Sequence, residues 1–186
     1  MTKTYRAVVG IDPSISSSGV AVHQPERSVA RTRVLVVPTR EQGQDHFNRM
    51  ERMHFGANGV IAKVPYNSLV LYEGPAFGAK GASFHDLAGF WWKLYELLAT
   101  GWSDVIVVPP TTLKKFATGK GTAKKEEVML AAVRRWPDLN ITGNDTADAA
   151  VLMQMGRVLT GTADFEMPKT HMEALAGLQL SEGLKS

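Results

Sequence analysis

Apolar residues fall into short unbroken runs along this chain, and longer stretches with helical spacing separate the later runs. The segments predicted as strands are 5–12 (YRAVVGID), 19–24 (GVAVHQ), 31–38 (RTRVLVVP), 68–74 (SLVLYEG) and 104–110 (DVIVVPP). Unbroken runs of this length are typical of strands that are buried on both faces of a sheet. Short polar turns join the first three, so we expect these strands to form an antiparallel meander.

Apolar residues at helical spacing predict four helices, over residues 41–63, 83–100, 122–136 and 145–159. Thr122 and Asn144 are expected to cap the last two, and Pro137 is expected to end the third. The order of elements predicts an α/β fold with a five-stranded mixed sheet. Its three antiparallel strands come before the helix-linked parallel strands, and helices cover both faces. We expect one domain over residues 1–160 and a tail with some helical character over residues 161–186.

The composition fits one globular domain. The chain has 186 residues, of which 44% are hydrophobic and 21% are charged. It has no cysteine, which excludes disulfides and thiolate metal sites. The N-terminus lacks the apolar core of a signal peptide, and no apolar run reaches membrane-spanning length. We therefore expect a cytoplasmic protein that does not bind a membrane.

Positive charge is concentrated in the predicted domain. The net charge is +3, but residues 161–186 hold four of the 18 acids and two of the 21 bases, which leaves +5 on residues 1–160. Residues 112–135 alone hold seven bases against two acids. This distribution favours a polyanionic partner.

Four acids stand where predicted elements end or begin. Asp12 and Glu73 close strands, and Asp145 and Asp148 open the last helix three residues apart on one face. If the fold gathers them, a divalent cation is the simplest way to keep them ionised, as in a two-metal site that cleaves phosphodiesters. Taken singly, each has an ordinary structural interpretation: a turn former, a strand-end surface charge or a favourable first-turn helix charge.

Four segments together resemble a known family. They are VGIDPSISSSG, LYEGPAFGAK, VPPTTLKKFATGKGTAKKEEV and NDTADAA, in this order between about residues 5 and 160. In sequence and spacing the chain resembles the RuvC family of Holliday-junction resolvases, within the RNase H-like superfamily. The resemblance implies a five-stranded RNase H-like fold. It also implies that Asp12, Glu73, Asp145 and Asp148 are the catalytic, metal-binding acids.

The resemblance further implies an endonuclease that uses two Mg²⁺ or Mn²⁺ ions in each active site. One ion would activate the attacking water and the other would stabilise the leaving 3′ oxygen, which leaves 5′-phosphate and 3′-hydroxyl ends. Family members act as homodimers that nick two opposed strands of branched DNA such as four-way junctions. The sequence does not identify a helicase partner.

The resemblance also suggests DNA contacts. The lysines expected to bind phosphates are Lys80, Lys114, Lys115, Lys120, Lys124 and Lys125. For all of them except Lys80, a solvated helix face is the alternative interpretation. Phe77 is expected to stack on an unpaired base, with core packing as the alternative. Its loop is one residue longer than is usual in cellular members, which suggests a divergent, phage-type protein.

Three other functions remain to be weighed. An RNA-processing nuclease of the YqgF-like branch would share the fold, but the four acids and the lysine segment favour the resolvase. A non-catalytic junction-binding protein would lack one or more of the acids. An actin-like ATPase or sugar kinase would need a second phosphate loop and about twice the length.

Overall fold

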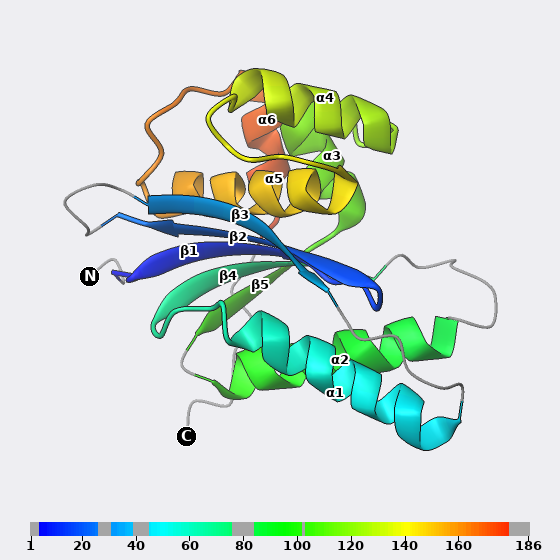
Figure 1. Ribbon diagram of the computed structural model, residues 1–186. Coiled ribbons are helices and arrows are strands. Elements are labelled where there is room, and N and C mark those ends of the chain that lie inside the picture. Colours follow the sequence, from blue (N-terminus) through cyan, green and yellow to red (C-terminus); the bar gives the residue numbers. More distant parts are fainter. Residues whose placement is uncertain (1–3, 26–30, 39–44, 76–83, 102, 179–186) are drawn as a thin grey trace.

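One mixed β-sheet forms the centre of the protein, and helices cover both of its faces (Figure 1). The computed structural model describes residues 4–25, 31–38, 45–75, 84–101 and 103–178. The strands are β1 (Ala7–Asp12), β2 (Ser17–Gln24), β3 (Arg31–Pro38), β4 (Ser68–Glu73) and β5 (Asp104–Val108). They lie in the order β3-β2-β1-β4-β5, which confirms the predicted five-stranded mixed sheet.

The strand pairing brings the ends of β1 and β4 together in the middle of the sheet. β1 pairs antiparallel with β2, and β2 pairs antiparallel with β3, as expected for a meander. β1 and β4 are parallel, with Ile11 opposite Tyr72, and β5 is parallel to β4. The next residues, Asp12 and Glu73, are therefore neighbours at the C-terminal ends of two parallel, central strands.

Two helical layers enclose the sheet. The helices are α1 (His46–Ile61), α2 (Phe84–Thr100), α3 (Pro110–Thr118), α4 (Lys125–Arg135), α5 (Asn144–Leu159) and α6 (Lys169–Met172), followed by the 3₁₀ helix η1 (Glu173–Leu175). In Figure 1, α1 and α2 lie on one face, and α3 to α6 lie on the other. Within the ranges described above, no helix is both long and apolar enough to cross a membrane.

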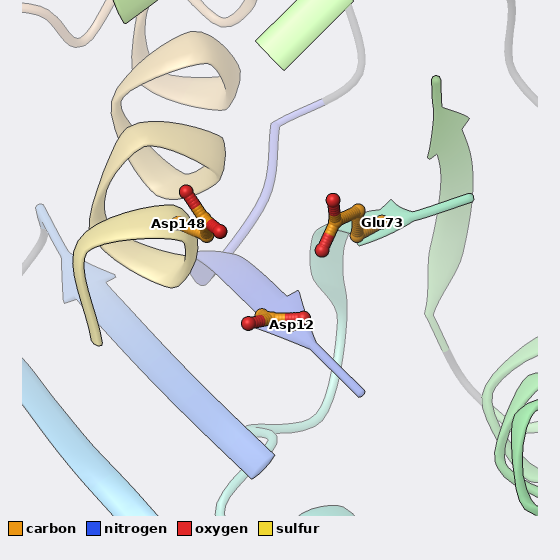
Figure 2. Close-up of side chains that lie close together, drawn as sticks. All are labelled: Asp12, Glu73 and Asp148. Carbon is orange, nitrogen blue, oxygen red and sulfur yellow. The ribbon is translucent and has the colours of Figure 1, made fainter. Parts of the chain in front are cut away.

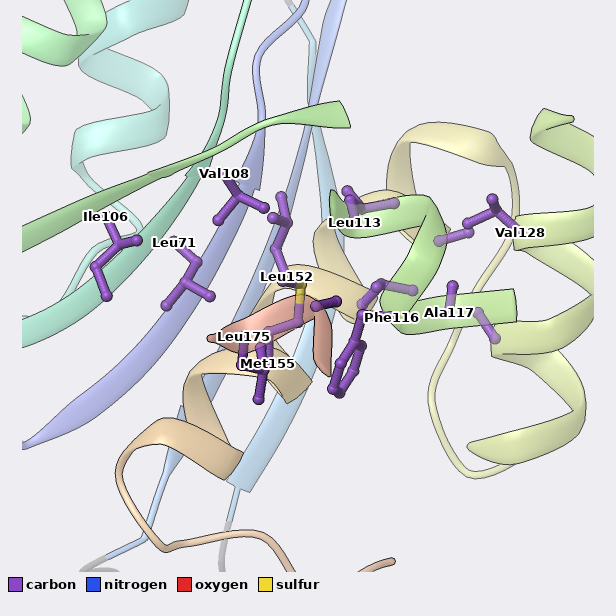
Figure 3. Packing of buried hydrophobic residues seen from close by; sticks show 14 of the residues in the cluster. Leu71, Ile106, Val108, Leu113, Phe116, Ala117, Val128, Leu152, Met155 and Leu175 are labelled. Atoms are coloured by element: carbon purple, nitrogen blue, oxygen red, sulfur yellow. The ribbon is translucent and has the colours of Figure 1, made fainter. Parts of the chain in front are cut away.

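Side chains of the central strands alternate between apolar clusters on the two faces of the sheet. Val9 and Ile11 pack with the residues of α2, whereas Leu71 packs with α3, α4 and α5 on the opposite face (Figure 3). A strand with both faces buried has little room for polar side chains, which explains the unbroken apolar runs.

Glycines let α5 lie directly on the sheet. A Cβ atom at Gly10 would overlap the carbonyl oxygen of Ala149, and one at Gly19 would overlap the carbonyl oxygen of Asp145. The backbone of the helix can approach the strands this closely only where the side chain is absent. The contact fixes the start of α5 beside the end of β1.

Helix α3 is missing from the sequence prediction, which treated its residues as a basic segment without an assigned structure. It begins directly after β5 with Pro110 in its first turn, where a missing N–H leaves no helical bond unmade. Its nine residues include one proline and three threonines, which weaken the helical pattern.

Helix α4 begins at Lys125, so the predicted cap at Thr122 is wrong. Instead, the Glu127 carboxylate accepts a 2.7 Å hydrogen bond from the N–H of Lys124.

The start of α5 also differs from the prediction. Asn144 lies inside the helix and Gly143 takes the cap position, so the predicted cap is wrong. The Thr146 hydroxyl accepts hydrogen bonds from the N–H groups of Thr142 (3.0 Å) and Gly143 (2.9 Å), and the second is the bond that the third helical residue makes to the cap residue in a capping box. Pro137 lies just beyond the end of α4, as predicted.

The segment that follows α5 packs against the α3 side of the domain. Ala174 and Leu175 are buried in the same cluster as Phe116. Asp164 forms a 2.8 Å ion pair with Arg157, whose side chain is buried. The predicted domain boundary at residue 160 stays a prediction, but the described part of this segment, residues 161–178, contributes to the core.

Candidate metal centre

Three carboxylates from distant parts of the chain converge where β1, β4 and α5 meet (Figure 2). The ligand oxygens of Asp12, Glu73 and Asp148 all lie within 4.8 Å of one another, and the three residues are partly buried. Asp12 and Glu73 are the last residues of their strands, and Asp148 lies near the start of α5. The fold therefore gathers three of the four acids that the sequence analysis singled out.

Burial and neighbouring negative charge both disfavour the ionised forms of Asp12 and Asp148. Burial raises the pKa of Asp12 well above its ordinary value, and the negative charge of Glu73 raises it further. Burial also raises the pKa of Asp148 to about 7, again with a contribution from Glu73. Carboxylates this close cannot all ionise near neutral pH without a positive charge among them.

The donor set fits a divalent metal ion. All three side chains offer carboxylate oxygens, which are the ligands that hard cations such as Mg²⁺ and Mn²⁺ prefer. A cation held between them would offset the burial cost and the repulsion that together raise the pKa values of Asp12 and Asp148. The cluster is thus suited to bind metal and is strained electrostatically without it.

The fourth predicted acid, Asp145, lies next to this cluster. Its carboxylate accepts a 3.1 Å hydrogen bond from the Ser17 hydroxyl at the start of β2. Its negative charge contributes to the raised pKa values of both Asp12 and Asp148. Asp145 is not among the three mutually close ligands, so its role as a metal ligand stays a prediction.

Helix α2 braces the strand end that carries Glu73. The indole Nε1 of Trp91 donates a 2.8 Å hydrogen bond to the main-chain carbonyl of Glu73. In the reverse direction, the Tyr72 hydroxyl donates a 3.0 Å bond to the carbonyl of Trp91. The N–H of Gly74 bonds to the carbonyl of Val108 at 2.8 Å, so β5 holds the other side of this strand end.

Two of the predicted DNA-binding lysines lie near the acids. The positive charges of Lys125 and Lys114 both act to lower the pKa of Asp148, which places them within electrostatic reach of the cluster. Lys125 is the first residue of α4, and Lys114 lies in the middle of α3. This side of the site therefore presents positive charge beside the carboxylates, as a phosphate-binding surface requires.

The other predicted DNA-binding lysines within the described residues are Lys115, Lys120 and Lys124. Lys115 forms a 3.4 Å ion pair with Glu173, and Lys120 and Lys124 are exposed. Phe77 and Lys80 lie outside the residues that the structure describes, so their roles stay predictions.

Two polar residues at the site were not identified from the sequence. Ser17 belongs to the polar stretch PSISSSG, where nothing distinguishes it from its neighbouring serines. Trp91 belongs to the helix predicted over residues 83–100, and it is buried while the neighbouring Trp92 is exposed. The spacing of apolar residues in this helix could not indicate that the indole N–H of Trp91 would bond to the backbone of Glu73, because that contact depends on how α2 crosses β4.

Sequence comparisons identify no relative of this chain: no protein-family model matches it, and no curated protein matches it. Comparison of structures does find similar proteins. The structure of RuvC from Thermus thermophilus matches with a TM-score of 0.58 and 24% identity, over 84% of this chain and 98% of that one. RuvC from T. thermophilus in complex with a Holliday junction substrate matches with a TM-score of 0.55 and 24% identity, over 86% and 98% of the two chains. The expectation of a phage-type member stays a prediction. By its architecture, the chain has the RuvC-type, RNase H-like fold.

Proposed function

We propose that this chain is a metal-dependent, structure-selective DNA endonuclease that resolves Holliday junctions or other branched DNA by paired nicks. The observation that carries the proposal is the cluster of Asp12, Glu73 and Asp148 in the middle of a RuvC-type sheet. A cluster of partly buried acids lowers the stability of a fold unless it binds a cation. A protein that retains such a cluster is therefore expected to use it.

The acids would hold the metal ions. Asp12, Glu73 and Asp148 are assigned as ligands of two Mg²⁺ or Mn²⁺ ions, with Asp145 as a fourth ligand, since its carboxylate is held beside them by Ser17. When bound, such ions activate the attacking water and stabilise the leaving 3′ oxygen, which yields 5′-phosphate and 3′-hydroxyl ends. Trp91 holds the backbone at Glu73 and so limits the movement of that ligand.

Lysines on α3 and α4 would orient the DNA backbone. Lys114 and Lys125 supply positive charge next to Asp148, where the phosphate to be cleaved would lie. Lys115, Lys120 and Lys124, with Lys80 and Phe77, are assigned to contacts farther along the DNA. Phosphate contacts of this kind position the duplex without reading its sequence.

The DNA substrate and the oligomeric state follow from the same assignment. A net charge of +5 on residues 1–160 favours DNA, and the similar T. thermophilus protein is known in complex with a Holliday junction substrate. Paired nicks on opposed strands need two active sites, so the active species would be a homodimer. We expect it to act in the cytoplasm.

The test is a cleavage assay on defined substrates. The purified protein is incubated with Mg²⁺ or Mn²⁺ and a four-way DNA junction, beside linear duplex, a flap and an RNA–DNA hybrid. Asp12→Asn should abolish cleavage and retain junction binding. Asp138→Asn, which changes an exposed acid outside the cluster, is the matched control and should cleave normally.

Each outcome separates one function from the others. Paired symmetric nicks on the junction would support a resolvase, and nicks on flaps as well would indicate a broader debranching nuclease. Activity on RNA alone would favour an RNA-processing nuclease of the YqgF-like branch. Junction binding without any cleavage would indicate a non-catalytic junction-binding protein and would contradict the role of the acids.

A further inference from the structure

The C-terminal end of α3 is closed by a residue from the other end of the domain. Carbonyl groups in the last turn of a helix have no partner within the helix. His171 of α6 bonds through Nδ1 to the main-chain carbonyl of Phe116 at 2.7 Å, and its side chain is buried. A carbonyl oxygen can only accept, so the imidazole carries its proton on Nδ1 and donates it.

The same imidazole packs against the turn that follows α3. Gly119 has a left-handed backbone, with φ of 81°, and its N–H bonds to the carbonyl of Lys115 at 2.8 Å. A Cβ atom at Gly119 would lie 3.1 Å from Nε2 of His171. Two residues later, a Cβ atom at Gly121 would lie 3.2 Å from the carbonyl oxygen of Thr111. The turn is thus held between α6 on one side and the start of α3 on the other.

Lys120 is the residue that this turn presents. It lies between the two closely packed glycines and is exposed. The Thr118 hydroxyl accepts a 3.2 Å hydrogen bond from the N–H of Lys120, which further fixes the direction of the backbone. A lysine on a fixed backbone loses less conformational freedom when it binds a phosphate than one on a mobile loop.

The segment that carries His171 is attached to α3 by more than one contact. Ala174 and Leu175 are buried against α3 residues, including Phe116. Glu173 forms the ion pair with Lys115 at 3.4 Å. These contacts keep α6 beside α3, but only His171 among them reaches the carbonyl in the last turn of α3 and the glycine that ends this helix.

We propose that His171 is a positioning residue for DNA binding: it caps α3 and orders the turn Gly119–Lys120–Gly121, so that Lys120 is preset for a phosphate contact. The inference rests on the proposed function as far as DNA is concerned. In this proposal, residues 161–178 take part in substrate binding, whereas the sequence alone suggested only a tail there.

The first measurement is the salt dependence of junction binding. The slope of log Kd against log salt concentration reports the number of phosphates that are neutralised. Binding of a labelled four-way junction is measured in EDTA for the wild type, Lys120→Ala, His171→Ala, and the double variant. Lys120→Ala and His171→Ala should each reduce the slope by about one, and the double variant should reduce it no further.

Two controls separate positioning from general loss of stability. His171→Asn keeps an N–H donor in a similar position and should restore much of the slope. Leu175→Ala removes packing from the same segment without removing the donor, so it should lower the stability but leave the slope unchanged. Urea denaturation establishes that every variant is folded under the binding conditions.

Hydrogen exchange of the amides of residues 116–121 provides a readout that does not need DNA. His171→Ala should speed their exchange more than Leu175→Ala does, relative to the loss of global stability. A wild-type slope and wild-type exchange in folded His171→Ala would overturn the inference, as would an equal loss of slope in Leu175→Ala. A wild-type protein that binds no junction would instead overturn the proposed function, and the exchange data would still decide whether His171 orders the turn.

Discussion

The indole N–H of Trp91 bonds to the main-chain carbonyl of Glu73, so a helix on one face of the sheet holds an acid of the site in place. Trp91→Phe keeps an aromatic ring in the core but removes the donor. We expect a loss of about 1–2 kcal/mol in the free energy of unfolding, because a partly buried carbonyl is left without this donor. We also expect slower cleavage with little change in junction affinity, since Glu73 would be less well held.

Trp92→Phe is the matched control for this experiment, because Trp92 is the next residue and is 63% exposed. It should change stability by less than about 0.5 kcal/mol. Equal cleavage rates for Trp91→Phe and the wild type would contradict the bracing role of Trp91.

Ionisation of Asp148 should make a growing unfavourable contribution to the stability of the metal-free protein as the pH rises from about 4 to 7. Asp148 has an ordinary pKa of 3.8 that rises to about 7 in the folded protein. Between these values the folded state holds a proton that the unfolded chain has released, so raising the pH favours unfolding. Thermal melts in EDTA across this range measure the effect. The difference between wild type and Asp148→Asn isolates it from other groups, such as His23, whose pKa is lowered to about 4 by burial.

Metal binding should have the opposite dependence on pH. A cation must displace the proton that Asp148 holds, so its affinity should rise as the pH rises toward the pKa of about 7. Calorimetric titration with Mn²⁺ in buffers of different ionisation enthalpy would count the protons released. No proton release at pH 6 would contradict the raised pKa of Asp148.

Asp148→Asn should separate stability from activity. Removing one charge from the cluster relieves the repulsion, so the metal-free protein should gain on the order of 2 kcal/mol at pH 8. The same change removes a metal ligand and should abolish cleavage. Urea denaturation in EDTA gives the stability, and a loss of stability there would show that the carboxylate makes favourable contacts that outweigh the repulsion.

Gly19→Ala should push α5 away from the sheet. Its Cβ would overlap the main-chain carbonyl of Asp145, which cannot move without moving the helix. We expect a destabilisation of about 2–3 kcal/mol or more, together with weaker metal binding. Gly143→Ala is the control, since a Cβ there meets no atom within 4 Å and the cost should stay below about 1 kcal/mol. Similar losses in both variants would contradict the close-approach argument.

The positions of the strands and of the acids at their ends could be predicted from the sequence, because an unbroken apolar run shows both where a strand is buried and where it stops. Asp12 and Glu73 each follow such a run directly. Contacts between segments that are distant in the sequence could not be predicted. The packing of Gly10 against Ala149 and the bond from His171 to Phe116 depend on partners far away in the chain, and neither glycine nor histidine carries a local signal of its partner.

The three mutually close acids occupy positions 12, 73 and 148, so they are spread over most of the polypeptide. During synthesis on the ribosome, the first two acids emerge well before the third. The parallel β1–β4 pair can then form while Asp148 is still unmade or inside the exit tunnel. A nascent chain therefore has no complete metal site until α5 has emerged and packed against Gly10 and Gly19, so cleavage competence should not arise before this helix has been made and folded.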